Sequence, residues 1–336
     1  MKAAVIDEHG GPGSIRIDNN FPDPEPGPAD VIVRVGATTL NYHDIFTRKG
    51  MPGIKVPMPC IMGLDFSGEI ADVGSGITDW KVGQRVMIDP VDRVGPGGLI
   101  GEMWHGGLAE YCKVPSHHLV ALPDNVMYEH AACLPVAYGT ALRMMYTIGE
   151  VQKGDKVLIL GASGGVGTCA VQLAKRAGCE VIACASNQKK LDRLAKIGAD
   201  HLINYVEEDF MKAVWTKFGK PHRRRWGDGV DVVVNFTGGD TWVPSLRVLH
   251  RGGKVLTCGA TAGYDPTEDL RFIWSYELKV LGANGWMRED LTTLIELLDD
   301  GSLKPVVDTT LPLEEVNEAF RLLEDRVVFG KVVVKP

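Results

Sequence analysis

The spacing of hydrophobic positions changes near Tyr128, and the change divides the chain into two parts. Before this point apolar runs are short and are separated by glycine and proline, which is typical of strands and turns. This part predicts a compact β-rich domain with one short helix that starts near Tyr42. The expected strands are Ala3–Ile6, Ile15–Ile17, Val31–Ala37, Phe66–Val73, Arg85–Ile88 and Ala109–Val114.

Beyond Tyr128, short apolar runs alternate with segments whose apolar residues recur at helical spacing. Strands that alternate with helices predict a parallel, doubly wound sheet that binds its ligand at the carboxyl edge. The expected strands are Lys156–Leu160, Glu180–Ala185, His201–Asn204, Asp231–Asn235, Lys254–Cys258, Glu277–Gly282 and Gly330–Lys335. The expected helices are Tyr128–Ala137, Thr140–Ile148, Thr168–Ala177, Gln188–Lys196, Asp209–Phe218, Thr241–Leu249, Arg288–Asp300 and Leu313–Asp325.

A glycine-rich turn, Gly161-Ala-Ser-Gly-Gly-Val-Gly167, joins the first of these strands to its helix. In this context the turn predicts the phosphate-binding corner of a dinucleotide fold rather than a purely structural turn. Small residues let the backbone approach a pyrophosphate, and the N–H groups of the first helical turn face its charge. Ala162 replaces the first glycine of the usual motif. The predicted contacts are Ala162, Ser163, Gly164, Gly165, Val166 and Gly167.

The end of the next strand indicates which dinucleotide binds. NAD sites usually place an acid there, about 20 residues past the glycines, but this strand ends at Ser186. A small residue leaves room for a 2′-phosphate, and Lys190 in the following helix offers the countercharge. Tyr205 closes the adjacent strand. We therefore expect NADPH as the cofactor, with NADH as the alternative.

Composition narrows the classes of function. The chain has 336 residues, enough for two domains, and a net charge of −7, which argues against a general nucleic-acid surface. No apolar segment reaches the length that spans a membrane, so no membrane partner is expected. The seven cysteines form no C-x-x-C pair, which is typical of reduced thiols in the cytoplasm.

The order of these parts resembles the medium-chain dehydrogenase/reductase superfamily, over essentially the whole chain. Within it, the chain looks most like zinc-lacking quinone oxidoreductases and acryloyl-CoA-type reductases. The resemblance implies a GroES-like catalytic domain formed by residues 1–123 and 270–336, a Rossmann domain formed by residues 124–269, and a homodimer or homotetramer. The markers are Asn41-Tyr-His-Asp44, Gly63-Leu-Asp-Phe-Ser-Gly68, Trp80-Lys-Val-Gly-Gln-Arg-Val86, Gly107-Leu-Ala-Glu-Tyr111, Ala137-Tyr-Gly-Thr-Ala141, Ile203-Asn-Tyr205, Arg251-Gly-Gly253 and Phe329-Gly-Lys-Val-Val333.

Zinc alcohol dehydrogenases of the superfamily bind zinc through positions that are Asn41, Leu64 and, approximately, Ala132 here. None of these is a usual zinc ligand, and the stretch from Asp89 to Gly107 lacks the cysteines of a structural zinc lobe. We therefore expect no metal. Without a Lewis acid, the acceptor must be electron-poor, such as a quinone or an α,β-unsaturated carbonyl.

The resemblance also implies roles for individual residues. Asn41 is expected to hydrogen-bond the nicotinamide ribose or the substrate oxygen. Tyr42 is expected either to donate a hydrogen bond to the enolate oxygen or to have only a packing role. Asp65 is expected to orient neighbouring backbone or water. Thr140, Cys258, Gly259, Ala260 and Lys331 match segments that line the cofactor.

Two other readings of the sequence stay open. One is an alcohol dehydrogenase that holds zinc with non-standard ligands, and the other is a nucleotide-binding protein without turnover. The natural substrate is not encoded in any motif that the sequence contains.

Overall fold

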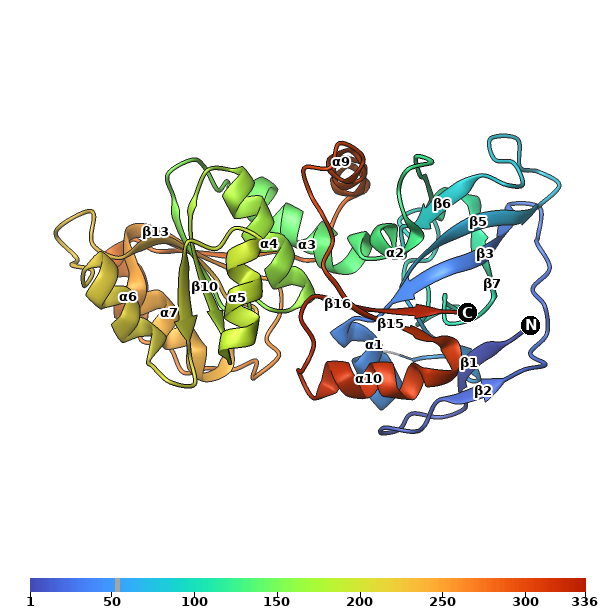
Figure 1. Cartoon of the computed structure of the whole chain (residues 1–336), viewed down its shortest axis with the longest axis horizontal. Helices are drawn as coiled ribbons and strands as arrows, with labels where there is room; N and C mark the ends of the chain where they lie inside the picture. The colour runs from blue at the N-terminus through green and yellow to red at the C-terminus, as the bar shows by residue number, and fades with distance from the viewer. Residues whose placement is uncertain (52–54) are drawn as a thin grey trace. The chain divides into compact units, whose positions relative to one another are not determined.

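The computed structural model describes residues 1–51 and 55–336, and these residues form two compact units (Figure 1). Unit 1 comprises residues 1–137 and 291–336, and unit 2 comprises residues 138–290. The sequence suggested limits at 123/124 and 269/270. Strand β14, Lys279–Gly282, lies beyond the second of these limits and pairs with β13, Leu249–Thr257, in the sheet of unit 2.

Unit 1 is built from two β-sheets. A three-stranded sheet has the order β2-β1-β4, and a seven-stranded sheet runs β15-β16-β3-β5-β6-β8, with β7 paired to β3. The long antiparallel pair β3 and β5 forms the middle of the larger sheet. The strands are β1 Ala3–Ile6, β2 Arg16–Asp18, β3 Asp30–Thr39, β4 Cys60–Ile61, β5 Asp65–Val73, β6 Arg85–Ile88, β7 Tyr111–Pro115, β8 Leu119–Ala121, β15 Val307–Pro312 and β16 Lys331–Lys335.

Two helices of unit 1 pack on each other and support the predicted site. Helix α1, Tyr42–Lys49, follows Asn41, whose backbone N–H donates to the Asp44 carboxylate at 2.8 Å. Arg48 is fully buried on α1 and donates to both carboxylate oxygens of Glu324, at 2.9 and 3.0 Å, on α10, Val316–Glu324. This ion pair fixes α1 and therefore the direction of the residues at its start. The other helical segments of the unit are η1 Ser116–His118, α2 Tyr128–Ala131 and η5 Leu313–Glu315; η2 Leu134–Gly139 and α9 Arg288–Asp299 cross the limits between the units.

Unit 2 confirms the expected doubly wound sheet. Its six strands are all parallel in the order β11-β10-β9-β12-β13-β14, so the order reverses between β9 and β12. Figure 1 shows α4 and α5 on one face of this sheet and α6 and α7 on the other. The elements are α3 Thr140–Leu142, η3 Arg143–Ile148, β9 Lys156–Ile159, α4 Gly165–Arg176, β10 Glu180–Ala185, α5 Gln188–Lys196, β11 His201–Asn204, α6 Phe210–Phe218, β12 Val230–Val234, η4 Gly239–Thr241, α7 Trp242–Val248, β13, α8 Leu270–Tyr276 and β14.

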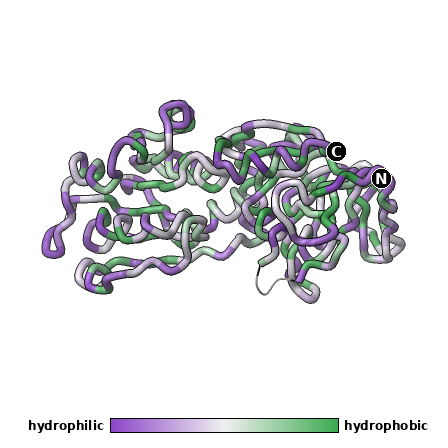
Figure 2. Tube along the Cα trace, turned by 90° about the horizontal axis from the view of Figure 1, so that it is seen from below, coloured by the Kyte–Doolittle hydropathy of each residue, from purple (hydrophilic) through white to green (hydrophobic). Residues whose placement is uncertain are grey.

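The core of unit 2 lies on both faces of its sheet. The strands of unit 2 are apolar on both faces, as expected for a sheet that helices cover on both sides. Several loop tips are strongly hydrophilic in the trace coloured by hydropathy (Figure 2). No helix among the described residues is long and apolar enough to cross a membrane.

The glycine turn is shaped by contacts that only glycine allows. A Cβ atom on Gly167 would lie 2.4 Å from the carbonyl oxygen of Gly161 and 2.6 Å from Cα of Ala162, because α4 packs directly onto the end of β9. A Cβ atom on Gly164 would meet only the Gly161 oxygen, at an ordinary 3.6 Å. Gly161 itself has φ of 65° and faces the Phe236 ring, which follows β12.

These contacts distinguish Gly167, the motif glycine at which helix and strand pack closely, from Gly164, the motif glycine at which the backbone approaches a pyrophosphate. Gly167→Ala is expected to lower the free energy of unfolding by about 1–3 kcal/mol, because backbone atoms must move to admit the methyl group. Gly164→Ala is the matched control and should cost less than about 1 kcal/mol. Urea unfolding of both variants checks this; equal losses would show that the close packing at Gly167 is not limiting.

Candidate functional site

Three buried polar side chains meet in unit 1 around Asn41, which the resemblance matches to a zinc-ligand position. Lys331 Nζ donates to Asn41 Oδ1 at 2.5 Å and to the Leu40 carbonyl at 2.9 Å. Asn41 Nδ2 donates to Asp65 Oδ2 at 2.8 Å, and Lys331 Nζ lies 3.5 Å from the same oxygen. All three side chains are buried. The structure thus brings together Asn41 and Asp65, as catalytic candidates, with Lys331, which the resemblance had assigned to the cofactor.

Each member of this network comes from a different element. Asn41 caps the start of α1, Asp65 opens β5, and Lys331 opens β16 near the end of the chain. Asp65 also accepts from the backbone N–H of Val136 at 3.1 Å through its other oxygen. The carboxylate is therefore held from two sides, and its role of orienting neighbouring backbone or water stays a prediction.

Burial is the largest cause of the raised pKa values of the two acids in this region. It raises the pKa of Asp65 to about 6, although the Lys331 charge and the Asn41 hydrogen bond both favour the carboxylate. Burial also raises the pKa of Asp44, which lies in the first turn of α1. A single buried ammonium therefore faces two carboxyl groups that titrate above their usual range.

Tyr42 points away from this network. Its hydroxyl donates weakly to the Leu323 carbonyl, at 3.4 Å, and accepts from Arg326 Nε at 3.2 Å. Its ring packs beside Phe46 and against the core of unit 1. These contacts favour the packing alternative for Tyr42, and its role as a proton donor stays a prediction.

A histidine–carboxylate pair that the sequence did not reveal lies beside Tyr42. His43 Nε2 is hydrogen-bonded to Glu102 Oε2. The His43 side chain is 29% exposed, whereas that of Glu102 is 8% exposed. Burial lowers the pKa of His43, but the hydrogen bond to Glu102 and its charge, with Asp44 and Asp65 nearby, raise it overall. His43 stands in the marker Asn41-Tyr-His-Asp44, but Glu102 is 59 positions away in a glycine-rich loop, so no spacing rule could pair them.

The three family positions for catalytic zinc do not fit that metal. Both ends of the Asn41 amide are engaged by Asp65 and Lys331. Leu64 and Ala132 are buried apolar residues without a donor atom in the side chain. The adjacent Cys133 donates to the Glu129 carbonyl at 3.1 Å, and burial raises its thiol pKa to about 12.

In unit 2 the predicted glycine corner has the form of an anion cradle. Gly164 precedes α4 in an extended conformation, and no side chain caps the helix. The N–H groups of its first turn are thus left to a ligand, and a Cβ atom at Gly164 would meet only the Gly161 oxygen. A dinucleotide pyrophosphate fits this arrangement of backbone donors without a charged side chain in the turn itself.

The residues predicted to bind the rest of the dinucleotide follow the carboxyl ends of neighbouring strands. Ser186 follows β10, and the Tyr205 N–H donates to the Ala185 carbonyl at 3.2 Å, so the two strand ends are adjacent. The Lys190 N–H donates to Asn187 Oδ1 at 3.0 Å, which places Lys190 in the first turn of α5. The remaining predicted residues are Thr140 in α3 and Cys258, Gly259 and Ala260 after β13. Their contacts with a cofactor stay predictions.

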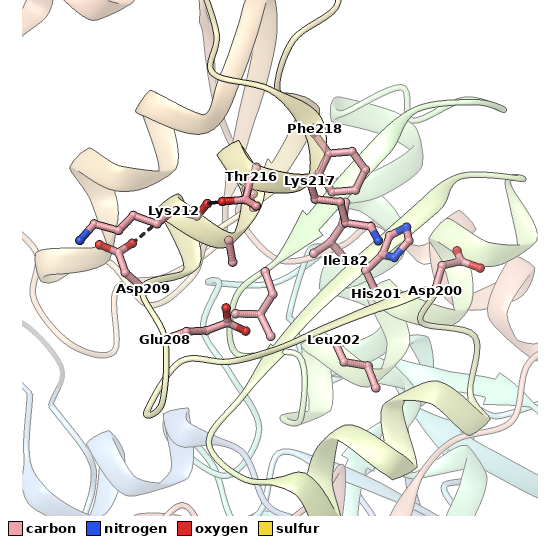
Figure 3. A pocket seen from close by; sticks show the side chains of 13 residues that line it. Ile182, Asp200, His201, Leu202, Glu208, Asp209, Lys212, Thr216, Lys217 and Phe218 are labelled. Atoms are coloured by element: carbon pink, nitrogen blue, oxygen red, sulfur yellow. Dashed lines mark hydrogen bonds between the residues drawn. The ribbon is translucent and has the colours of Figure 1, made fainter.

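A hollow of about 600 Å³ lies elsewhere in unit 2, between β10, β11 and α6 (Figure 3). Ile182, His201, Lys212 and Phe218 are among the residues that line it. None of the predicted cofactor residues lies on its wall, so we do not assign the dinucleotide to it.

The seven thiols are all unpaired in the structure, and six of them are buried. Burial raises the thiol pKa of Cys60 and Cys258 to about 12 and that of Cys179 to about 11. It also raises the pKa values of Cys112, Cys169 and Cys184. These groups are protonated at neutral pH and are weak nucleophiles.

Comparison with known proteins places this geometry in a family. Residues 27–124 match the model of the alcohol dehydrogenase GroES-like domain, and residues 165–300 match that of the zinc-binding dehydrogenase. The chain is 32% identical to acryloyl-coenzyme A reductase of Sulfurisphaera tokodaii over 355 residues, covering both chains fully. It is also 32% identical to the chloroplastic NADPH-dependent alkenal/one oxidoreductase of Arabidopsis thaliana, covering 100% of this chain and 80% of that protein.

A solved structure described as an NAD-dependent alcohol dehydrogenase superposes with a TM-score of 0.92 at 36% identity, covering 100% of both chains. The matched domains, the glycine corner and the full-length relatives agree. The chain therefore belongs to the medium-chain dehydrogenase/reductase superfamily, in its branch of NAD(P)H-dependent reductases.

Proposed function

We propose that this protein is an NADPH-dependent reductase that transfers hydride to an electron-poor double bond without a catalytic metal. The observation that carries the proposal is the network of Asn41, Asp65 and Lys331, in which both ends of the amide at the first family zinc position are engaged by other side chains. The acceptor classes are enoyl thioesters, enones and quinones. The names of the acryloyl-CoA and alkenal/one relatives support the first two.

The chemistry of these acceptors explains why a metal is dispensable. Oxidation of a simple alcohol requires removal of a weakly acidic proton, which zinc promotes as a Lewis acid. Conjugation already makes the β-carbon of an unsaturated carbonyl electrophilic, so hydride adds there and the charge moves to the carbonyl oxygen. Preorganised hydrogen-bond donors then suffice to stabilise the enolate.

NADPH is the proposed hydride source, and NADH is the alternative. No acid occupies the strand end at Ser186, and Lys190 begins the next helix. The absence of a carboxylate leaves room for a 2′-phosphate, and the lysine offers it a countercharge. When bound, the cofactor supplies the hydride; the chain's own residues position it and handle the proton.

Asn41 is the proposed link between the buried network and the reacting atoms. One N–H of its amide is directed to Asp65, and a primary amide carries a second. We assign that second N–H to the cofactor ribose or the substrate oxygen. Lys331 polarises the amide through Asn41 Oδ1, so the donor strength of Asn41 depends on the buried ammonium.

The His43–Glu102 pair is the proposed proton donor to the enolate. The glutamate raises the pKa of His43, which keeps imidazolium available closer to neutral pH. Protonated His43 would give its proton to the α-carbon and recover one from water. Tyr42 is the second candidate for this role, and its contacts with α10 make it the weaker one.

A homodimer in the cytoplasm is the proposed state of the enzyme, with a homotetramer as the alternative assembly. β14 is the edge strand of the unit 2 sheet and is largely exposed, including Val280, which is 45% exposed. Pairing with a second copy would cover this edge. Sedimentation at micromolar concentration tests the assembly. The unpaired thiols favour a reducing compartment.

The first prediction concerns the acceptor. Protein treated with a chelator and mixed with NADPH should reduce crotonyl-CoA, a simple enone or a quinone, measured by loss of NADPH absorbance. Ethanol and cyclohexanol with NADP⁺ should give no comparable rate. The alcohol dehydrogenase reading, which the similarity to that solved structure favours, requires the opposite: alcohol turnover that zinc restores and chelation abolishes. NADPH binding without any oxidation would support the reading without turnover.

The second prediction concerns Lys331. Lys331→Met leaves the Asp65 carboxylate buried without its cation, so the variant should lose about 3–5 kcal/mol of unfolding free energy at pH 8. Because the folded-state pKa of Asp65 is already raised to about 6, its ionisation lowers stability as pH rises from about 4 through 6. In the variant this loss should be larger and extend to higher pH.

Two control variants test whether the lost Lys331 charge, rather than the substitution itself, causes the loss of stability. Lys335→Met, on the same strand, removes an exposed pair with Glu129 and should cost less than about 1 kcal/mol. Adding Asp65→Asn to Lys331→Met should recover much of the loss. If the loss in Lys331→Met is independent of pH and persists in the double variant, the ion pair does not control stability here.

The third prediction concerns the residue that donates the proton to the enolate. His43→Gln should reduce kcat about 100-fold or more, whereas Tyr42→Phe should change it little. Glu102→Gln lowers the pKa of His43, so its activity should decline at a lower pH than that of the wild type. Steady-state pH profiles for the three variants check this. A large loss in Tyr42→Phe with normal turnover in His43→Gln would reverse the assignment.

A further inference from the structure

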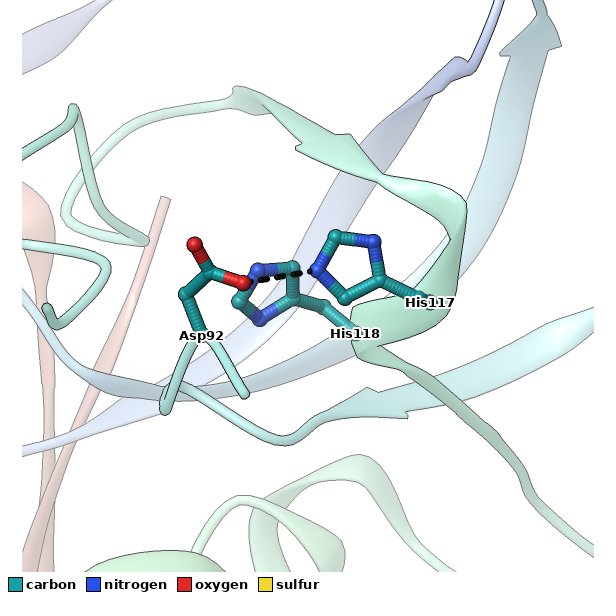
Figure 4. A group of neighbouring side chains, drawn as sticks. All are labelled: Asp92, His117 and His118. Atoms are coloured by element: carbon teal, nitrogen blue, oxygen red, sulfur yellow. Dashed lines mark hydrogen bonds and ion pairs between the residues drawn. The ribbon is translucent and has the colours of Figure 1, made fainter. Parts of the chain in front are cut away.

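Two adjacent histidines and an aspartate converge in unit 1, away from the residues assigned to hydride transfer. His117 and His118 form the end of η1, between β7 and β8, and Asp92 lies in the loop after β6. One ligand atom from each of the three residues lies within 4.8 Å of the other two (Figure 4). Asp92 and His118 are buried, and His117 is about one-third exposed.

The backbone fixes which nitrogen His118 offers. Its Nδ1 lies 2.6 Å from the Asp89 carbonyl oxygen, which can only accept, so Nδ1 carries the proton. Nε2 is then the nitrogen with a lone pair, and Figure 4 shows the ring beside the Asp92 carboxylate. Histidines that bind metals are oriented in this way, by a second nitrogen that donates to a carbonyl or carboxylate.

The loop holds Asp92 as an ionised ligand. Asp92 Oδ1 accepts from the N–H groups of Val94 at 3.1 Å and Gly95 at 2.8 Å, and Oδ2 accepts from Gly97 at 3.3 Å. Asp92 thus has a fixed orientation before any ligand arrives.

The ligand atoms of these groups are close enough to converge on a small tetrahedral ion. Ligand atoms about 2.0–2.1 Å from a zinc ion lie about 3.3 Å from one another. His117 Nε2 and Asp92 Oδ1 are hydrogen-bonded at 3.1 Å, and the three ligand atoms lie within 4.8 Å of one another, so an ion would replace this hydrogen bond and draw the three groups together. Two imidazoles with one carboxylate suit zinc or cobalt, whereas calcium and magnesium prefer shells of oxygen.

We propose that Asp92, His117 and His118 bind one Zn²⁺ ion in a structural role, with water as a fourth ligand. The ion would tie the loop after β6 to the turn between β7 and β8. It would bring the site from one negative charge to one positive charge, beside the Asp89–Arg93 ion pair. The site is separate from Asn41, Leu64 and Ala132, and hydride transfer does not pass through it.

Binding of Co²⁺ to the site can be followed directly by its visible absorption. Chelator-treated full-length protein titrated with Co²⁺ should develop visible ligand-field absorption that saturates at one equivalent, and Zn²⁺ should displace it. His117→Ala removes a partly exposed ligand with little risk to folding and should weaken binding more than about 100-fold. His130→Ala, a partly buried histidine of the same unit, should bind like the wild type.

Thermal unfolding provides the second measurement. Zn²⁺ should raise the Tm of the wild type and of His130→Ala, but not that of His117→Ala or Asp92→Asn, because the ion stabilises only the folded state that binds it. The proposal is overturned if the wild type takes up no Co²⁺, or if His117→Ala binds it as tightly. Reductase activity that survives chelation while the Tm falls would place the ion outside the reaction.

Discussion

The candidate site depends on the contacts that the buried Lys331 ammonium makes with the start of α1 and with Asp65. The ammonium comes from a strand near the end of the chain and contacts the start of α1, while Asp65 joins it from β5. Three distant segments are therefore aligned around one buried charge. Removing two charges from water is costly, and such a pair is retained only when hydrogen bonds satisfy its atoms. Asn41 supplies those hydrogen bonds to both partners, so the amide, the acid and the ammonium act as one unit.

In the proposed function, this arrangement replaces the catalytic metal of the zinc-containing members of the superfamily. A zinc ion at the three family positions would need thiolate, imidazole or carboxylate ligands, and the chain has Asn41, Leu64 and Ala132 there. A fixed ammonium provides positive charge in the same region without a coordination shell that a substrate must enter. The anion site predicted in unit 2 differs from this network, because its glycine corner presents backbone N–H groups rather than side chains.

The periodicity of the chain predicted most of the fold because strands and helices of unit 2 carry regular apolar patterns. It missed β15, Val307–Pro312, whose residues Asp308, Thr309 and Thr310 break the pattern and which depends on pairing with β16. It also missed β4, since two residues are too few for any pattern. Within the site, local motifs identified Asn41 and Asp65. The partnership of Lys331 with both, and of Glu102 with His43, depends on long-range folding that no spacing encodes.

The state of the thiols has a consequence for an enzyme of this proposed chemistry. Enones and acryloyl thioesters are Michael acceptors, and accessible thiolates add to them irreversibly or slowly reversibly. The cysteines of this chain are unpaired yet mostly enclosed, and their raised pKa values keep them protonated. Even Cys258, the half-buried one beside the predicted cofactor segment, is held as a thiol. A catalyst built in this way can handle soft electrophiles without being alkylated by them.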